Sequence, residues 1–214
     1  MSFFDDFPPP PPPPELQPRR RQPWEGPPRG VIGGWVPWHI VLARSDRAYA
    51  VLRDFEAFPS GLHFELVMYY EDDDPTWPMG RRHRMRDPEA FRLGVRFSDG
   101  RKTASTQWPS PEDEAHPTVP ILHPGGGGGG GGKWEMSYWL WPLPPAGPLT
   151  WVASWPEVGA NETTVEVDAT VLEEAAASAE QLWEEDDSEG GSGYRRMSRS
   201  VSARSAARKP PLSD

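Results

Sequence analysis

The segment 133–183 constrains the fold most, because alternating apolar patterns there lead directly into a helical one. Residues 134–141 carry large apolar side chains with period two, which is typical of a β-strand that buries one face. The same period predicts strands at 148–156 and 163–169. The segment therefore predicts three strands followed by a helix.

That helix is predicted over residues 171–183, where apolar side chains recur at helical spacing. Thr170 and Glu173 have the Thr-x-x-Glu spacing of a capping box, in which each side chain accepts a backbone N–H of the first turn. An acidic run and two glycines after residue 183 end the pattern.

Five earlier segments also have strand character, and they are residues 36–43, 48–53, 62–70, 91–97 and 102–107. Asp99-Gly100 joins the last two, because Asp-Gly supplies the positive φ that a tight hairpin turn needs. About eight strands against one helix predict a mainly β fold. The architecture that we expect is an antiparallel two-layer β-sandwich with one C-terminal helix.

The two ends of the chain differ in composition from the middle. Residues 1–23 contain seven consecutive prolines, and residues 188–214 are rich in Ser, Arg, Ala and Gly. Neither segment has enough large apolar side chains to offset the entropy of ordering it. We therefore predict disordered tails at 1–23 and 188–214 around a single β-rich domain at 24–187. In the second tail, two arginines precede Ser198, which makes Ser198 a candidate phosphorylation site.

Eight consecutive glycines, Gly125–Gly132, interrupt the strand pattern. Such runs are typical of flexible tethers, because glycine is costly to order. Since strands continue after the run, we interpret it as a flexible loop within the domain and expect its length to be dispensable. A phosphate-binding P-loop is excluded, because Trp134 follows Lys133 where that motif needs Ser or Thr.

The formal net charge of −10 is concentrated in the middle of the chain. Residues 24–187 contain 13 basic and 27 acidic side chains, so we expect the folded domain to repel phosphate backbones and to bind no nucleic acid. The chain has no cysteine, which excludes disulfides, zinc–thiolate sites and iron–sulfur clusters. No stretch approaches eighteen apolar residues and no secretory signal is evident, so we expect no membrane span and a cytoplasmic location.

Two polar residues of the strand 62–70 are candidates for chemistry. His63 and Glu65 lie two residues apart on one face, where a metal ion could bridge them. The five histidines never occur at His-x-His spacing, so we expect no metal and no cofactor and assign no catalytic residue. The sequence leaves open whether the protein is an enzyme and favours binding over catalysis.

Eleven tryptophans are the main anomaly of the composition. Trp139 and Trp141 lie on one face of the strand 134–141, and Trp134, Met136, Tyr138 and Leu140 lie on the other, which we predict to face the core between the sheets. We expect the helix to cover Trp139 and Trp141. If the helix lies elsewhere, both form an exposed aromatic platform and are candidate binding residues, together with His63 and Glu65.

Residues 151–159, which read Trp-Val-Ala-Ser-Trp-Pro-Glu-Val-Gly, and the segment from Leu172 to Trp183 resemble a C-terminal pattern of uncharacterised soluble proteins of high-GC actinobacteria. Lysine occurs only at positions 102, 133 and 209, which fits a GC-rich genome. The resemblance covers about a quarter of the chain. It implies no activity, ligand or catalytic residue.

These observations predict a non-enzymatic binding or interaction domain that uses an aromatic-rich β surface. An alternative hypothesis is a hydrolase or metal-dependent enzyme with His63 and Glu65 in its site. A further alternative is a structural subunit of an assembly. We expect a protein partner or self-association.

Overall fold

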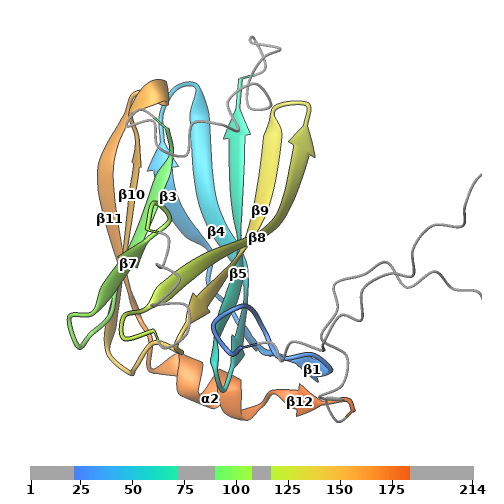
Figure 1. Cartoon of the computed structure of the whole chain (residues 1–214). Helices are drawn as coiled ribbons and strands as arrows, with labels where there is room; N and C mark the ends of the chain where they lie inside the picture. The colour runs from blue at the N-terminus through green and yellow to red at the C-terminus, as the bar shows by residue number, and fades with distance from the viewer. Residues whose placement is uncertain (1–21, 72–89, 108–116, 184–214) are drawn as a thin grey trace, which may run out of the picture. The chain divides into compact units, whose positions relative to one another are not determined.

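The computed structural model describes residues 22–71, 90–107 and 117–183 (Figure 1). All of them belong to one unit that spans Arg21–Asp186. The predicted disorder of residues 1–21 and 188–214 and the candidate site Ser198 lie outside the described residues.

The described residues form twelve strands, one α-helix and one 3-10 helix. Their bounds are β1 Val31–Ile32, β2 Gly34–Val36, β3 Ile40–Arg44, β4 Ala48–Phe58, β5 Gly61–Tyr70, β6 Arg92–Arg96, β7 Lys102–Ala104, β8 Ile121–Gly130, β9 Lys133–Trp141, β10 Pro148–Trp155, η3 Pro156–Val158, β11 Ala160–Asp168, α2 Val171–Ala177 and β12 Glu180–Gln181. Every strand pairing among them is antiparallel. The prediction of a mainly β, antiparallel fold with one helix is confirmed.

The strands form two large sheets and one short pair. The larger sheet has the order β2-β4-β5-β9-β8, and β3 also pairs with β4. The smaller has the order β11-β10-β6-β7, while β1 pairs with β12. Strand β4 pairs with β3 before, and with β2 after, a bulge that follows Arg53, where Asp54 has a φ of 53°.

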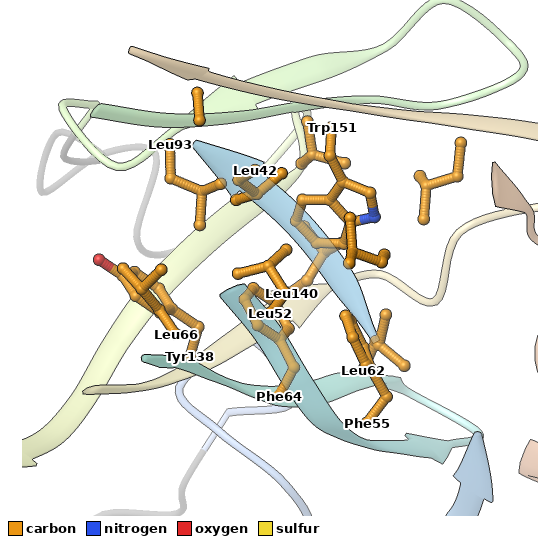
Figure 2. Close-up of a cluster of buried hydrophobic side chains, with 14 of the residues drawn as sticks. Leu42, Leu52, Phe55, Leu62, Phe64, Leu66, Leu93, Tyr138, Leu140 and Trp151 are labelled. Carbon is orange, nitrogen blue, oxygen red and sulfur yellow. The ribbon is translucent and has the colours of Figure 1, made fainter. Parts of the chain in front are cut away.

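Aromatic side chains join the two large sheets (Figure 2). The ring of Trp151 from β10 meets the ring of Phe64 from β5 edge-on at 5.0 Å, and Tyr138 from β9 stacks on Phe64 at 5.6 Å. Tyr138 and Leu140 are buried, and Met136 packs against the same core, as the alternation in β9 predicts. Burial raises the pKa of Tyr138 to about 12, so its phenol stays neutral there.

The helix is shorter than the sequence predicts. α2 ends at Ala177, and the chain then extends to pair β12 with β1. The backbone N–H of Leu182 donates to the carbonyl of Gly30 at 2.7 Å. The predicted helix over 171–183 is therefore wrong in its last turns, because pairing with a distant strand outweighs a local helical preference.

α2 packs against β2 and β4, and glycine makes this close approach feasible. A side chain at Gly34 would collide with the backbone carbonyl of Ala175 in the helix. Leu172 and Ala176 of the helix are buried, and both belong to the same core as the large sheets.

The predicted capping box at the start of α2 does not form, because Thr170 makes no side-chain cap hydrogen bond. Its hydroxyl and its N–H instead donate to Oδ1 of Asp168, at 2.6 and 2.9 Å. These two bonds lower the pKa of Asp168. The Thr170 side chain therefore bonds to the Asp168 carboxylate and not to a backbone N–H of the first helical turn.

The glycine run is a strand and not a loop. Gly127–Gly130 pair with the residues from Met136 to Lys133 on β9, and Gly131 and Gly132, with φ of 58° and 76°, form the hairpin turn. The predicted loop over 125–132 is therefore wrong. Glycine has no local strand preference, but the hairpin gives each of these residues a partner on β9, whose own side chains pack on the core.

This pairing demands glycine at only some positions of the run. A Cβ at Gly129 would collide with the Lys133 carbonyl, and one at Gly127 would lie 2.8 Å from the Glu135 carbonyl oxygen. Nothing lies within 4 Å of a Cβ at Gly128. Alternate glycines are therefore needed for close approach to β9, whereas those between them face open space.

We expect Gly129→Ala to lower the free energy of unfolding by about 1–3 kcal/mol, because the β9 backbone must move. Gly128→Ala, the matched control, should leave it unchanged or raise it by about 0.5 kcal/mol, because alanine restricts the unfolded chain. Urea unfolding followed by far-UV circular dichroism measures both values. Equal values for the two variants would contradict the strand and favour a flexible loop.

Candidate functional site

Five side chains form a row across the outer face of the larger sheet, opposite the core. Strand register places Trp35 beside Glu56, Glu56 beside His63, His63 beside Trp139, and Trp139 beside His123. The predicted candidates His63 and Trp139 are thus direct neighbours, and each contributes from a different strand. His123 joins them through β8.

Trp139 is buried and has a structural role. It is 2% exposed, its ring meets Phe58 edge-on at 5.6 Å, and its Nε1–H donates to the carbonyl of Pro23 at 3.0 Å. The indole also packs closely against Gly61, where a Cβ would lie 2.6 Å from the ring. Trp139 therefore cannot contribute to an exposed platform.

The cover over this end of the sheet comes from the N-terminal segment. Trp24 meets Trp141 edge-on at 5.6 Å, one residue after the contact of Pro23 with Trp139. The expectation that the helix covers both tryptophans is wrong, because α2 packs against β2 and β4 instead. Pro23, which the composition assigns to the N-terminal tail, is part of this cover. Trp141 is partly buried beneath it.

Glu65 belongs to a network of charges in the middle of the same face. Arg53 Nη2 lies 3.3 Å from Glu65 and 2.8 Å from Glu135, and Arg53 Nε lies 3.1 Å from Asp54. Burial opposes the charge on Arg53, but these three carboxylates outweigh it and the pKa of Arg53 is raised. The carboxylate of Glu65 is therefore compensated by a neighbouring cation.

Lys133 completes the network from the far end of β9. Its Nζ lies 2.6 Å from Glu135, and this hydrogen bond lowers the pKa of Glu135. His63 stands apart, with its Nδ1 3.9 Å from Glu56. The structure thus brings His63 and Glu65 to one face, as the alternation of β5 predicts, but pairs them with different partners.

Five exposed apolar side chains belong to neighbouring elements around the short β1–β12 pair. Eight large apolar residues are exposed among those the structure describes. Five of them come from β1, β2, α2 and the two residues after β12. We call these five the terminal apolar patch, and they are Ile32, Trp35, Val171, Leu182 and Trp183. Figure 1 shows β1, β12 and α2 together at one end of the described unit.

The elements of the terminal apolar patch are joined through their backbones. Strands β1 and β12 pair, the Leu182 N–H donates to Gly30, and Gly34 of β2 packs closely against α2, so that Trp35 projects from the other face of β2. Trp35 and Trp183 are 71% and 62% exposed, which is high for the largest apolar side chain. Sequence analysis missed the patch, because a helix through residue 183 would have placed Trp183 on a buried stripe.

Acidic side chains outnumber basic ones around the terminal apolar patch, where Arg29 beside β1 is also exposed. Glu173, Glu174 and Glu180 are exposed on α2 and β12. The sequence contains neither lysine nor arginine between Lys133 and Arg195. The patch is therefore an apolar surface with a mostly acidic rim.

Among the residues that the structure describes, no group of three His, Cys, Asp or Glu side chains could hold a metal ion. In the same part of the chain, no helix is both long and apolar enough to cross a membrane. The chain matches no protein-family model, no curated protein and no solved structure. The resemblance to actinobacterial proteins stays a prediction.

Proposed function

We propose that this protein is a non-enzymatic interaction domain that binds a partner protein through the terminal apolar patch. The observation that carries the proposal is that five of the eight large apolar side chains exposed among the described residues belong to neighbouring elements. Large apolar residues that gather on a surface mark interaction sites more often than ones scattered singly. Tryptophan is also the residue most enriched among those that dominate binding energies.

The acidic rim defines the chemistry of the partner. A surface that complements Glu173, Glu174 and Glu180 is apolar at its centre and carries Lys or Arg at its edge. Nucleic acid does not fit, because its phosphates would meet carboxylates. We propose a basic partner protein in the cytoplasm.

The alternative of a hydrolase or metal enzyme has weaker support. Arg53 Nη2 donates to Oε2 of Glu65 and so occupies an oxygen that a substrate or metal would use. His63 has one carboxylate neighbour, Glu56, at 3.9 Å. These contacts favour a role for Arg53, Glu65 and Glu135 in stabilising the sheet.

The test uses the immobilised full chain and a lysate of its native host. We expect capture of a basic protein, which is then purified and titrated against the chain by calorimetry. The double variant Trp35→Ser with Trp183→Ser should raise the dissociation constant at least about tenfold, because aromatic anchors dominate such interfaces.

The matched control removes two exposed apolar side chains elsewhere, through Val41→Ser with Tyr69→Ser. It should bind the captured protein as the unaltered chain does. Circular dichroism verifies that both variants are folded. Equal affinities of the patch variant and the unaltered chain would refute the proposal.

A further inference from the structure

The larger sheet ends in an edge strand, β8, whose last six residues are all glycine. β8 lies at the end of the strand order and pairs with β9 only. Its residues Gly125–Gly130 are all exposed. Among the described residues, no backbone hydrogen bond joins these six glycines to any strand other than β9.

The hairpin geometry identifies which backbone groups point outward. A two-residue turn with positive φ at both positions makes its flanking residues, Gly130 and Lys133, a hydrogen-bonded pair. Because such pairs alternate along an antiparallel ladder, Gly128 also faces β9. The N–H and C=O groups of Gly127 and Gly129 therefore point away from the sheet.

Most edge strands of natural proteins are protected by charges, proline, bulges or shortness. The edge strand β7 has three residues, and β11 carries Glu162, Glu166 and Asp168. β11 also lies against β3, where the Thr163 hydroxyl donates to the Leu42 carbonyl. Pro124 and the bulge that follows it protect only the start of the glycine run in β8. From Gly127 to Gly130 the strand has neither charge nor side chain.

We propose that this edge pairs with the same edge of a second copy of the chain, as two antiparallel β8 strands related by a two-fold axis. The inference concerns a surface other than the terminal apolar patch and stands independently of the proposed function. In such a pair, Gly127 of one copy lies opposite Gly129 of the other, so that all outward groups of both residues are satisfied. Gly128 then lies opposite its own counterpart.

Two observations favour a second copy over an unrelated peptide. A bare backbone has no side-chain pockets with which to select a foreign sequence, whereas two identical strands match each other in length and turn position. The protein also has a net charge of −10, so two copies repel each other least through an uncharged segment. Because the regular edge is short, we expect a weak dimer, with a dissociation constant of about 10–100 μM.

The test is sedimentation of the full chain at concentrations from about 5 to 500 μM. We expect a concentration-dependent dimer. Gly128→Lys and Gly128→Glu should each raise the dissociation constant about tenfold or more, because two like charges would face each other across the axis. An equimolar mixture of the two variants should regain most of the lost affinity, since Lys then faces Glu. A Cβ at position 128 meets open space, and circular dichroism verifies that both variants are folded, since position 128 lies opposite Glu135 of β9.

The control variant is Thr164→Lys, an equal change of charge on the exposed edge strand β11. It should dimerise as the unaltered chain does, as should the patch variant Trp35→Ser with Trp183→Ser. A monomer at every concentration would overturn the inference. Dimerisation that survives Gly128→Lys, or that is not regained in the mixture, would also overturn it.

Discussion

Trp151→Ala is expected to lower the free energy of unfolding by about 3–5 kcal/mol, because it removes the side chain that joins the two large sheets. Trp151 is fully buried, and its ring lies 5.0 Å from Phe64 and 6.1 Å from Phe55. Alanine would leave a cavity between the two sheets. The backbone hydrogen bonds within each sheet prevent the sheets from moving together to fill it. Urea unfolding followed by far-UV circular dichroism measures the loss.

The matched variant Trp151→Phe should lower the free energy of unfolding much less, by about 1–2 kcal/mol. It keeps one aromatic ring against Phe64. It also removes the indole N–H, which is buried without a hydrogen-bond partner among the described residues. If Trp151→Ala cost under about 1 kcal/mol, the two sheets would not share the core described above.

Trp139→Ala is also expected to lower the free energy of unfolding by about 3–5 kcal/mol, but for a different reason. Trp139 lies on the outer face, and its indole is held between Phe58 and the carbonyl of Pro23. Its loss removes one of the contacts that hold the N-terminal segment 22–30 on the sheet, the hydrogen bond to Pro23. Besides the urea transition, we therefore expect faster hydrogen exchange of backbone amides in this segment.

Trp139→Phe provides the control for the hydrogen bond. It retains a ring beside Phe58 and loses only the hydrogen bond to the Pro23 carbonyl. We expect this loss to lower the free energy of unfolding by about 1 kcal/mol. Exchange in α2 should stay as it is in the unaltered chain, because the helix packs on β2 and β4. Faster exchange in α2 without a change in residues 22–30 would mean that the helix covers Trp139 after all.

The candidate site could be predicted only in part. Alternation within β5 places His63 and Glu65 on one face, and that placement is a local property of a strand. Their partners are Glu56 and Arg53, which lie on β4 on either side of a bulge. A bulge shifts the register by one residue, and no pattern in the sequence indicates it. The sequence alone therefore could not predict that Arg53 lies beside Glu65.

The sequence by itself determined the elements whose side chains alternate. β5, β9 and β10 each have an apolar face of period two, and burial of that face needs no information from elsewhere in the chain. Only the tertiary structure decided where residues without such a pattern go. The glycine run has no preference of its own and became an edge strand because β9 offered it a partner.

The same reason accounts for the ends of the domain. The helical pattern after residue 171 is a weak local preference, and it gave way at Ala177 because β1 pairs with residues 180–181. Pro23 and Trp24 have no strand or helix pattern, yet they are ordered by two tryptophans more than a hundred positions away. Contacts at such separation depend on the completed sheet, which exists only once the whole domain has folded.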